Sequence, residues 1–265
     1  MKVTRRAYYH PGKNVSGLFR PKSRAVVPAV RVPEGPFVDV LPVDGAAIRL
    51  NASDLVEVDG AQIQQGWTDD IGGIVFDGFS LYYRAKGIGG RPAVDMANGI
   101  DSPDAAPIAI DLFTFFMVVN RGESQQEFVS HVSAIIAGRE SSCRFGVAEM
   151  EWYAKSGFSP ANQTIYSITD PVPENTDVIL TFRTSADRAV KPVLQCMQNG
   201  VAKAAVETVA AQSPFSIQAP INLLSKGSLG YAVTRLAEFI YYPRILTAAE
   251  VAKVNRFLNR KYQLY

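Results

Sequence analysis

The chain has 265 residues, of which 47% are hydrophobic and 20% are charged, and its formal net charge is +2 at pH 7. This ordinary globular composition excludes disorder over the whole chain, and the length suits one large β-sandwich or two small domains. The first residues contain no apolar run of the kind found in signal peptides, and no apolar run is long enough to cross a bilayer. We therefore expect a protein that is made and kept in a cytoplasm without a signal peptide.

The N-terminal segment is strongly basic. Residues 1–31 contain eight lysines and arginines and no acidic residue, whereas the rest of the chain has 19 basic and 25 acidic residues. Six prolines between positions 11 and 42 disfavour helix and favour extended backbone. A basic segment on an acidic body is typical of an interaction arm. We expect residues 1–48 to be an extended arm ordered by a neighbouring subunit; the alternative is an arm packed on its own domain.

The arm combines cations with aromatic rings. Surfaces of this kind bind single-stranded nucleic acids, but the acidic body and the lack of a nucleic-acid motif argue against that partner. Protein is the expected partner instead, because Arg and Tyr are favoured at protein interfaces. The residues expected at this interface are Arg5, Arg6, Tyr8, Tyr9, Phe19, Arg20 and Arg24.

After the arm, apolar runs and turn residues predict a succession of strands. Residues 46–58 are expected to form a strand and turn, followed by a turn at Asp59-Gly60, and residues 72–83 two short aromatic strands. Residues 96–107 are expected to be a loop. Asn199-Gly200 is the strongest hairpin signal, because both residues tolerate the positive φ of a type I′ turn. Further strands are predicted at 112–119, 127–137, 144–153, 162–168, 177–183 and 190–198.

The C-terminal segment predicts a strand and then a helix. Residues 236–242 are apolar and aromatic, and Pro243 ends them. Thr247 lies three residues before Glu250, the spacing of a capping box, in which each side chain satisfies a backbone N–H of the helix start. A helix over 247–263 would be amphipathic and dock by one face. The residues of that face are Val251, Val254, Leu258 and Tyr262. Many strands with one late helix indicate an all-β sandwich.

One strand contains a candidate pair of catalytic carboxylates. Within it, Glu149, Glu151 and Tyr153 share one face, while Met150 and Trp152 share the other and would enter the core. Retaining hydrolysis needs two carboxyl groups about 5–5.5 Å apart, and two alternate glutamates alone do not define a nucleophile and an acid. A solvated strand face is therefore the favoured interpretation.

Glycan binding is a second use for the same face. A sugar site combines an aromatic ring, which stacks on the sugar, with carboxylates or amides that hydrogen-bond its hydroxyls. Tyr153 beside Glu149 and Glu151 is the expected patch, and Trp67 with Asp69 is a second one.

Other reactive residues show weaker patterns. His10 and His131 have no Gly-x-Ser-x-Gly elbow near them, and no phosphate-binding loop of the Gly-x-x-x-x-Gly-Lys type is present. Cys143 and Cys196 have no metal spacing and are too few for a disulfide framework, so we expect both to be small buried residues of strands. We expect no cofactor.

An acidic loop is the candidate calcium site. Asp95, Asn98, Asp101 and Asp104 are oxygen donors in or beside it, and calcium prefers such ligands. Their spacing fits no EF-hand, and the same residue types are common in turns. Plain turn residues are the favoured interpretation, and a calcium site at Asp101 and Asp104 is the alternative.

A series of short motifs has a recognisable order. It comprises QGWTD at 65–69, GGRPAVD at 89–95, DLFTFFMVV at 111–119, VLQCMQNGV at 193–201, and the C-terminal run that contains LAEFIYY, PRILTAAE and FLNRKYQL. Together these motifs resemble the concanavalin A-like, LamG-type jelly-roll domains found in bacterial surface proteins and in virion proteins of tailed phages. Glucanases of that fold carry a third acidic residue further along the glutamate strand, where this chain has Tyr153 and Ala154, so the glucanase pattern is incomplete.

The resemblance covers roughly residues 50–265 and implies a concanavalin A-like jelly-roll sandwich over residues 49–265, with an extended N-terminal arm and a short C-terminal helix. We expect a non-enzymatic tailed-phage virion protein, a capsid decoration or tail appendage. It would form homo-oligomers and bind other virion proteins through its arm. The alternatives are a lectin-like protein that recognises host-surface glycans and, third, a glycosidase.

Overall fold

The computed structural model describes residues 37–78, 80–96, 100–102, 108–109, 112–120, 126–132, 139–145, 150–156, 163–168, 173–185, 193–209, 218–219, 221–223 and 234–265. The chain divides into two compact units, residues 1–36 and residues 37–265, and the described residues all belong to the second. This unit begins at Phe37, before the domain boundary expected after residue 48. In the part of the chain that is described, no helix is long and apolar enough to span a membrane.

The first sheet is eight-stranded and antiparallel, and its central strand comes from near the end of the sequence. This strand, β19 (Thr234–Tyr242), pairs with β8 on one side and with β5 and β1 on the other. The remaining strands are β15 (Val201–Lys203), β14 (Val193–Gln198), β13 (Asp177–Ser185), β8 (Thr114–Asn120), β5 (Arg91–Met96), β4 (Leu81–Ile88) and β1 (Ile48–Asn51).

The second sheet is seven-stranded, with the order β16-β12-β11-β10-β9-β18-β6. Its strands are β16 (Ala205–Val209), β12 (Gln163–Ile168), β11 (Met150–Ser156), β10 (Arg139–Phe145), β9 (Gln126–Val132), β18 (Ile221–Leu223) and β6 (Ile100–Asp101). Two short ribbons and a 3-10 turn complete the described elements. They are β2 (Trp67–Thr68) with β3 (Val75–Phe76), β7 (Ile108–Ala109) with β17 (Gln218–Ala219), and η1 (Ala52–Asp54).

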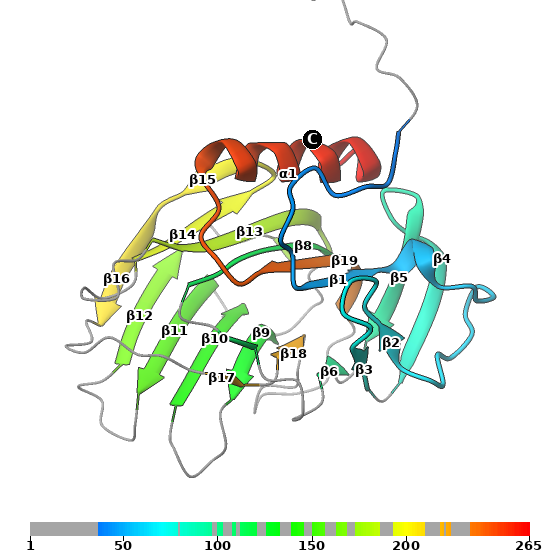
Figure 1. The fold of residues 1–265 in the computed structure, drawn as a ribbon, viewed down its shortest axis with the longest axis horizontal. Helices are drawn as coiled ribbons and strands as arrows, with labels where there is room; N and C mark the ends of the chain where they lie inside the picture. The colour runs from blue at the N-terminus through cyan, green and yellow to red at the C-terminus, as the bar shows by residue number, and fades with distance from the viewer. Residues whose placement is uncertain are drawn as a thin grey trace, which may run out of the picture. The chain divides into compact units, whose positions relative to one another are not determined.

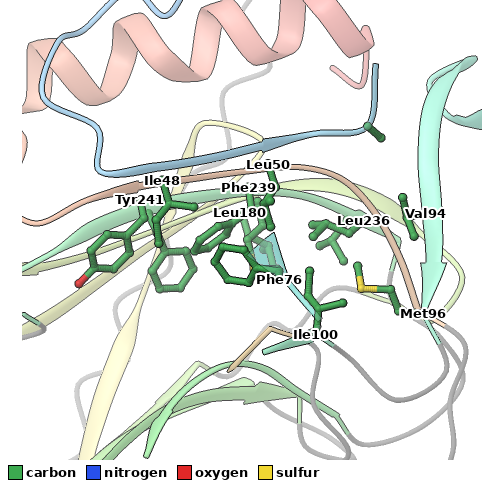
Figure 2. Close-up of a cluster of buried hydrophobic side chains, with 14 of the residues drawn as sticks. Ile48, Leu50, Phe76, Val94, Met96, Ile100, Leu180, Leu236, Phe239 and Tyr241 are labelled. Carbon is green, nitrogen blue, oxygen red and sulfur yellow. The ribbon is translucent and has the colours of Figure 1, made fainter. Parts of the chain in front are cut away.

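The core between the two sheets follows from the alternation of side chains along the strands. On β8, Phe115 and Met117 enter the cluster between the sheets, whereas Phe116 and Val118 lie on the opposite face. The second sheet contributes buried residues to the same cluster. Figure 2 shows ten labelled members: Ile48, Leu50, Phe76, Val94, Met96, Ile100, Leu180, Leu236, Phe239 and Tyr241. The expected all-β sandwich is confirmed.

The helix α1 (Ala248–Tyr262) covers the outer face of the eight-stranded sheet (Figure 1). Its start has the predicted capping box, because Thr247 and Glu250 each accept a hydrogen bond from the other's backbone N–H. The predicted apolar face is buried against Phe116, Val118 and Ile240 of the sheet. Both faces of β8 are therefore buried, which explains its unbroken apolar sequence.

Several strands differ from the sequence prediction. The strand predicted over 144–153 is two strands, since β10 ends at Phe145 and β11 begins at Met150, and the two pair with each other. Both halves have strand-like sequences, which concealed the reversal between them. The predicted loop at 96–107 includes the short strand β6. The Asn199-Gly200 hairpin is confirmed, because both residues have positive φ and join β14 to β15.

Candidate functional site

The outer face of the seven-stranded sheet is the candidate site. The helix packs on the eight-stranded sheet, and the apolar cluster fills the space between the sheets (Figure 1). In the described part of the chain no helix covers the other side of the seven-stranded sheet. This face is therefore the place to look for a ligand that binds on a sheet.

The register identifies which positions of the second sheet belong to that outer face. Ile168 and Ile100 are fully buried in the core between the sheets. Met150 lies opposite Ile168, and Trp152 belongs to the row of paired positions that ends at Ile100. Because directly opposed residues share a face and neighbours along a strand alternate, these positions mark the core side. The alternate positions of β11 belong to the outer face.

Two of the predicted glycan-site residues occupy these outer positions. Glu151 lies opposite Ser167 of β12 and Arg144 of β10, and Tyr153 is the next outer position along β11. Glu149 lies outside the described residues. The register therefore brings Glu151 and Tyr153 to the outer face of the seven-stranded sheet, on which no helix of the described residues packs.

Charged positions on the outer face are matched across the strands. Arg144 has Glu151 on one side and Glu127 of β9 on the other, and Lys155 of β11 lies opposite Glu140 of β10. Opposite charges at directly opposed positions stabilise a sheet by about 0.2–1 kcal/mol for each pair. By register, one row thus pairs one acid with one base, and the other places one base between two acids.

A row of polar positions, charged only at its end, runs between these two charged rows. Tyr153 lies opposite Ser142 of β10, Ser142 opposite Ser130 of β9, and Ser130 opposite Asn222 of β18. The row ends on the edge strand β6 at Asp101, which lies opposite Asn222. It therefore crosses most of the sheet with groups that donate and accept hydrogen bonds.

The second predicted glycan patch does not form an exposed surface. Trp67 and Asp69 are only 1% and 2% exposed. The Asp69 carboxylate accepts hydrogen bonds from the backbone N–H groups of Ile71, Gly72 and Ile74, at 2.9, 3.0 and 2.8 Å. Its role is to accept hydrogen bonds from the backbone N–H groups of the loop between β2 and β3. The Trp67 ring packs in the core. The expectation that this pair contacts a sugar is therefore corrected.

A buried polar cluster, which the sequence analysis did not predict, lies between α1 and the eight-stranded sheet. One carboxylate oxygen of Glu238 accepts a hydrogen bond of 2.8 Å from Arg49, and the other accepts one of 2.9 Å from Lys261 and one of 3.0 Å from the Tyr262 hydroxyl. Asp39 completes the cluster by bonding to Arg49 and Lys261.

Electrostatics in this cluster follow from burial and close pairing. Burial acts to raise the pKa of Asp39, but hydrogen bonds and charge from Lys261 and Arg49 hold it below its ordinary value. Burial, with the charge of Glu238, raises the pKa of Tyr262 well above its ordinary value. Nearby Asp70 differs, because burial raises its pKa to about 6 although Arg49 lies 3.4 Å away. The cluster links the segment 37–51 to the helix through hydrogen bonds and ion pairs. The charged groups of the cluster pair with one another inside the protein.

A β-bulge explains why Glu238 reaches this cluster. The register of β19 against β8 shifts between Leu236 and Glu238, so that Leu236 lies opposite Val119 and Glu238 opposite Val118. Bulges re-aim side chains in this way. The sequence signal was Glu238, a single acid in an apolar strand, because a buried carboxylate needs a cation beside it. Nothing in the neighbouring sequence identifies Arg49 and Lys261 as its partners.

Only some of the candidate calcium ligands lie in the described residues. Asp95 lies between two arginines, with 2.6 Å contacts to Arg84 and Arg235. Asp101 is in β6, and Asn98 and Asp104 lie outside the described residues. Among the residues that are described, no group of three His, Cys, Asp or Glu side chains is arranged to hold a metal ion.

The predicted arm residues lie outside the described residues, whereas both cysteines are in described strands. The expected arm-interface residues all precede Phe37 and lie outside the described residues; they are Arg5, Arg6, Tyr8, Tyr9, Phe19, Arg20 and Arg24. Cys196 is buried in β14 as expected, and burial raises the pKa of its thiol. Cys143 lies in β10, opposite Trp152.

Comparison with known proteins shows likeness of fold. No family model and no curated protein matches the sequence. The solved structure of the botulinum neurotoxin serotype G binding domain superposes with a TM-score of 0.56 at 11% identity, over 81% of this chain and 51% of that one. The binding domain of Paraclostridial Mosquitocidal Protein 1 has a TM-score of 0.54 at 11% identity, over 80% and 52%.

Part of a sialidase has a similar fold. The structure of Trypanosoma rangeli sialidase in complex with sialic acid has a TM-score of 0.55 at 12% identity, over 83% of this chain and 34% of that one. The chain thus spans about half of the toxin binding domains and about a third of the sialidase. At these identities the comparisons establish the β-sandwich fold.

Proposed function

We propose that the sandwich is a non-enzymatic module that binds glycans on the outer face of its seven-stranded sheet. The observation that carries this proposal is the register, which brings Glu151, Tyr153 and a row of polar residues to the sheet face that α1 leaves uncovered. The fold is shared with a neurotoxin binding domain and with part of a protein that binds sialic acid, which supports a recognition role.

The spacing of acids on this row does not fit retaining hydrolysis. The positions directly opposite Glu151 are Arg144 and Ser167, and the next acid along that row, Glu127, is two strands away. Strands are about 4.8 Å apart, so these two positions are separated by about 9–10 Å. Retaining enzymes hold their carboxyl groups about 5–5.5 Å apart, which this row does not provide.

Glycan binding is tested on an oligosaccharide array with the purified full-length protein and two tyrosine variants. We expect Tyr153→Ala to lose binding. Tyr82→Ala is the matched control, because Tyr82 is an exposed tyrosine of the other sheet. Folded protein that binds no glycan would contradict the proposal, and so would equal loss in both variants.

The second proposed role is structural, as a tailed-phage virion protein that decorates the capsid or forms a tail appendage. It rests on the jelly-roll motifs and on residues 1–31, which carry eight basic and no acidic residues. The sandwich has its own core beginning after that segment. The basic segment would then fasten the domain to capsid or tail proteins, and copies of the chain would associate with one another.

Deletion of residues 2–31 tests this structural role. The shortened protein should keep the unfolding midpoint of the full chain, because the described residues already form two apolar clusters beyond position 36. It should fail to join the parent assembly. Charge reversal at Arg5 and Arg6 should weaken attachment most at low salt, since exposed charges are screened over about 8–10 Å at physiological salt. Normal incorporation of the shortened protein would contradict the anchoring role.

A further inference from the structure

Three side chains of the buried polar cluster bring an amine, an amide and a carboxylate together. Lys261, Asn51 and Glu238 are only 3%, 2% and 1% exposed. The Nζ atom of Lys261 lies 2.8 Å from Oδ1 of Asn51 and 2.9 Å from Oε2 of Glu238. Asn51 is the last residue of β1 and lies directly opposite Glu238 on β19. The contact between Lys261 and Asn51 therefore joins β1 to the end of α1, 210 residues later in the chain.

The amine is held beside a carbonyl group that it can attack. Nζ of Lys261 donates a hydrogen bond to Oδ1 of Asn51, and the carbonyl carbon Cγ is bonded directly to that oxygen. Holding two reacting groups in place makes their reaction a step within one molecule, with effective concentrations that reach about 10⁵–10⁸ M in well-oriented cases. The backbone N–H of Ser53 donates a hydrogen bond of 3.2 Å to the same Oδ1. This donor is placed to stabilise the negative charge that develops on Oδ1 during an attack on Cγ.

Two carboxylates beside the amine can move its protons. Glu238 is positioned to take one proton from the Lys261 ammonium, which leaves a neutral amine. Oδ2 of Asp39 lies 2.8 Å from Nζ of Lys261 and accepts a hydrogen bond of 3.4 Å from Nδ2 of Asn51, so it contacts both the attacking and the leaving nitrogen. Burial acts to raise the pKa of Asp39, and Lys261 and Arg49 hold it below its ordinary value. The first proton transfer removes the charge of Lys261, after which Asp39 can pass a second proton from Nζ to Nδ2.

We propose that Lys261 and Asn51 form an intramolecular isopeptide bond, with Glu238 and Asp39 transferring the protons. The new bond joins Nζ to Cγ, and the bond between Cγ and Nδ2 breaks. Nζ gives up two protons, of which one stays on Glu238 and the other leaves with Nδ2 as ammonia. The charge of the cluster is unchanged, because an ammonium and a carboxylate become an amide and a carboxylic acid. The side chain of Asp39 is 36% exposed, so the leaving nitrogen lies beside a group that reaches solvent.

Mass spectrometry of the purified full-length protein tests the proposal without variants. The bond should lower the intact mass by about 17 Da, the mass of one ammonia molecule released by the attacking amine. Trypsin cuts after Lys and Arg, so a digest should contain residues 50–84 joined to residues 261–265. The unreacted chain would instead release residues 262–265, because Lys261 would then be a cleavage site.

Three results would overturn the proposal. One is a folded protein whose mass stays unchanged after prolonged incubation at neutral pH. Another is a loss of about 18 Da, which marks condensation of the amine with a carboxyl group and release of water. The third is a loss of ammonia confined to Asn199-Gly200, where cyclisation of the asparagine gives the same change in mass without a cross-link.

Variants of the reacting groups are the second test. Lys261→Arg and Asn51→Ala should each abolish the joined peptide. Lys253→Arg, at an exposed position of the same helix, is the matched control and should keep it. Asp39→Ala retains both reacting groups and should slow the reaction about 10²–10⁴-fold, the usual contribution of a general acid–base group. Wild-type protein kept unfolded in urea should not react, because the groups are then apart. A joined peptide in Asn51→Ala would overturn the proposed bond, and equal rates in Asp39→Ala and wild type would overturn the role of Asp39.

Discussion

The ammonium group of Lys261, on the last turn of α1, donates a hydrogen bond of 2.9 Å to Glu238 of the central strand β19. Both side chains are almost fully buried. Arg49 bonds to the other carboxylate oxygen of Glu238, so this buried acid joins two cations, and Asp39 pairs with both of them. The helix is therefore fixed at its C-terminal end by charge, and along its length by apolar packing.

Glu238→Gln should be strongly destabilising. The amide keeps the shape of the side chain but leaves Arg49 and Lys261 without their shared buried charge, and breaking a buried ion pair costs about 3–5 kcal/mol. Glu57→Gln, at an exposed loop position, should change the free energy of unfolding by less than about 0.5 kcal/mol. Urea denaturation of both variants checks this, and equal stability of the two would show that Glu238 does not hold the helix.

Leu258→Ala tests the apolar docking of the helix. Leu258 is fully buried against the sheet, so its truncation should cost about 2–5 kcal/mol of unfolding free energy. Lys253→Ala, on the exposed side of the same helix, should be nearly neutral because Ala favours helix. Thr247→Ala should fall between them at about 1 kcal/mol, through loss of the cap. A neutral Leu258→Ala would contradict the packing.

The β4–β5 hairpin offers a comparison of adjacent glycines. Gly89 and Gly90 both have positive φ, and a Cβ on Gly89 would lie 2.0 Å from the carbonyl oxygen of Tyr262, whereas one on Gly90 would meet nothing within 4 Å. Gly90→Ala should cost about 1–2 kcal/mol, for the left-handed backbone alone. Gly89→Ala should cost about 1–3 kcal/mol more, because the hairpin must move away from α1. Thermal unfolding of both variants measures the difference, and equal costs would refute the close contact.

Acid should weaken the start of the helix through Glu250. Arg244, at 2.8 Å, and the hydrogen bonds from Thr247 lower the pKa of Glu250 to about 2. The folded state thus favours the carboxylate, and this stabilisation is present at neutral pH and is lost as pH falls from about 4.5 through about 2. The difference in unfolding free energy between wild type and Glu250→Gln should shrink over that range. A difference that stays constant from pH 7 to 2.5 would contradict the lowered pKa.

Local sequence patterns were sufficient for the helix and for the Asn199-Gly200 hairpin. The capping box at Thr247 involves contacts between residues only three positions apart. The spacing of Val251, Val254 and Leu258 defines one apolar face of the helix, which can dock on any apolar surface. The hairpin depends on two adjacent residues that accept positive φ. Short-range constraints of this kind can be read directly from residue types.

The remaining features depend on contacts distant in sequence. The bulge that brings Glu238 to Arg49 is a property of two paired strands, and neither strand alone reveals it. Trp67 and Asp69 looked like an exposed patch because a tryptophan beside an acid also occurs in loops, but the short β2–β3 ribbon buries both. For Glu151 and Tyr153, the strand pattern predicted a shared face, and the pairing of β11 with β10 and β12 was needed to say which face it is.

The position of β19 in the sheet has a consequence for biosynthesis. The apolar strand β8 pairs with β19, which is made about 120 residues later. At translation rates of about 5–20 residues per second, β8 is complete roughly 6–24 s before its neighbour. During that interval its run of Phe115, Phe116 and Met117 is without the partner that shields one edge, and exposed apolar strands of this kind aggregate. Overproduction should therefore favour inclusion bodies, and slower synthesis at low temperature should raise the yield of folded protein.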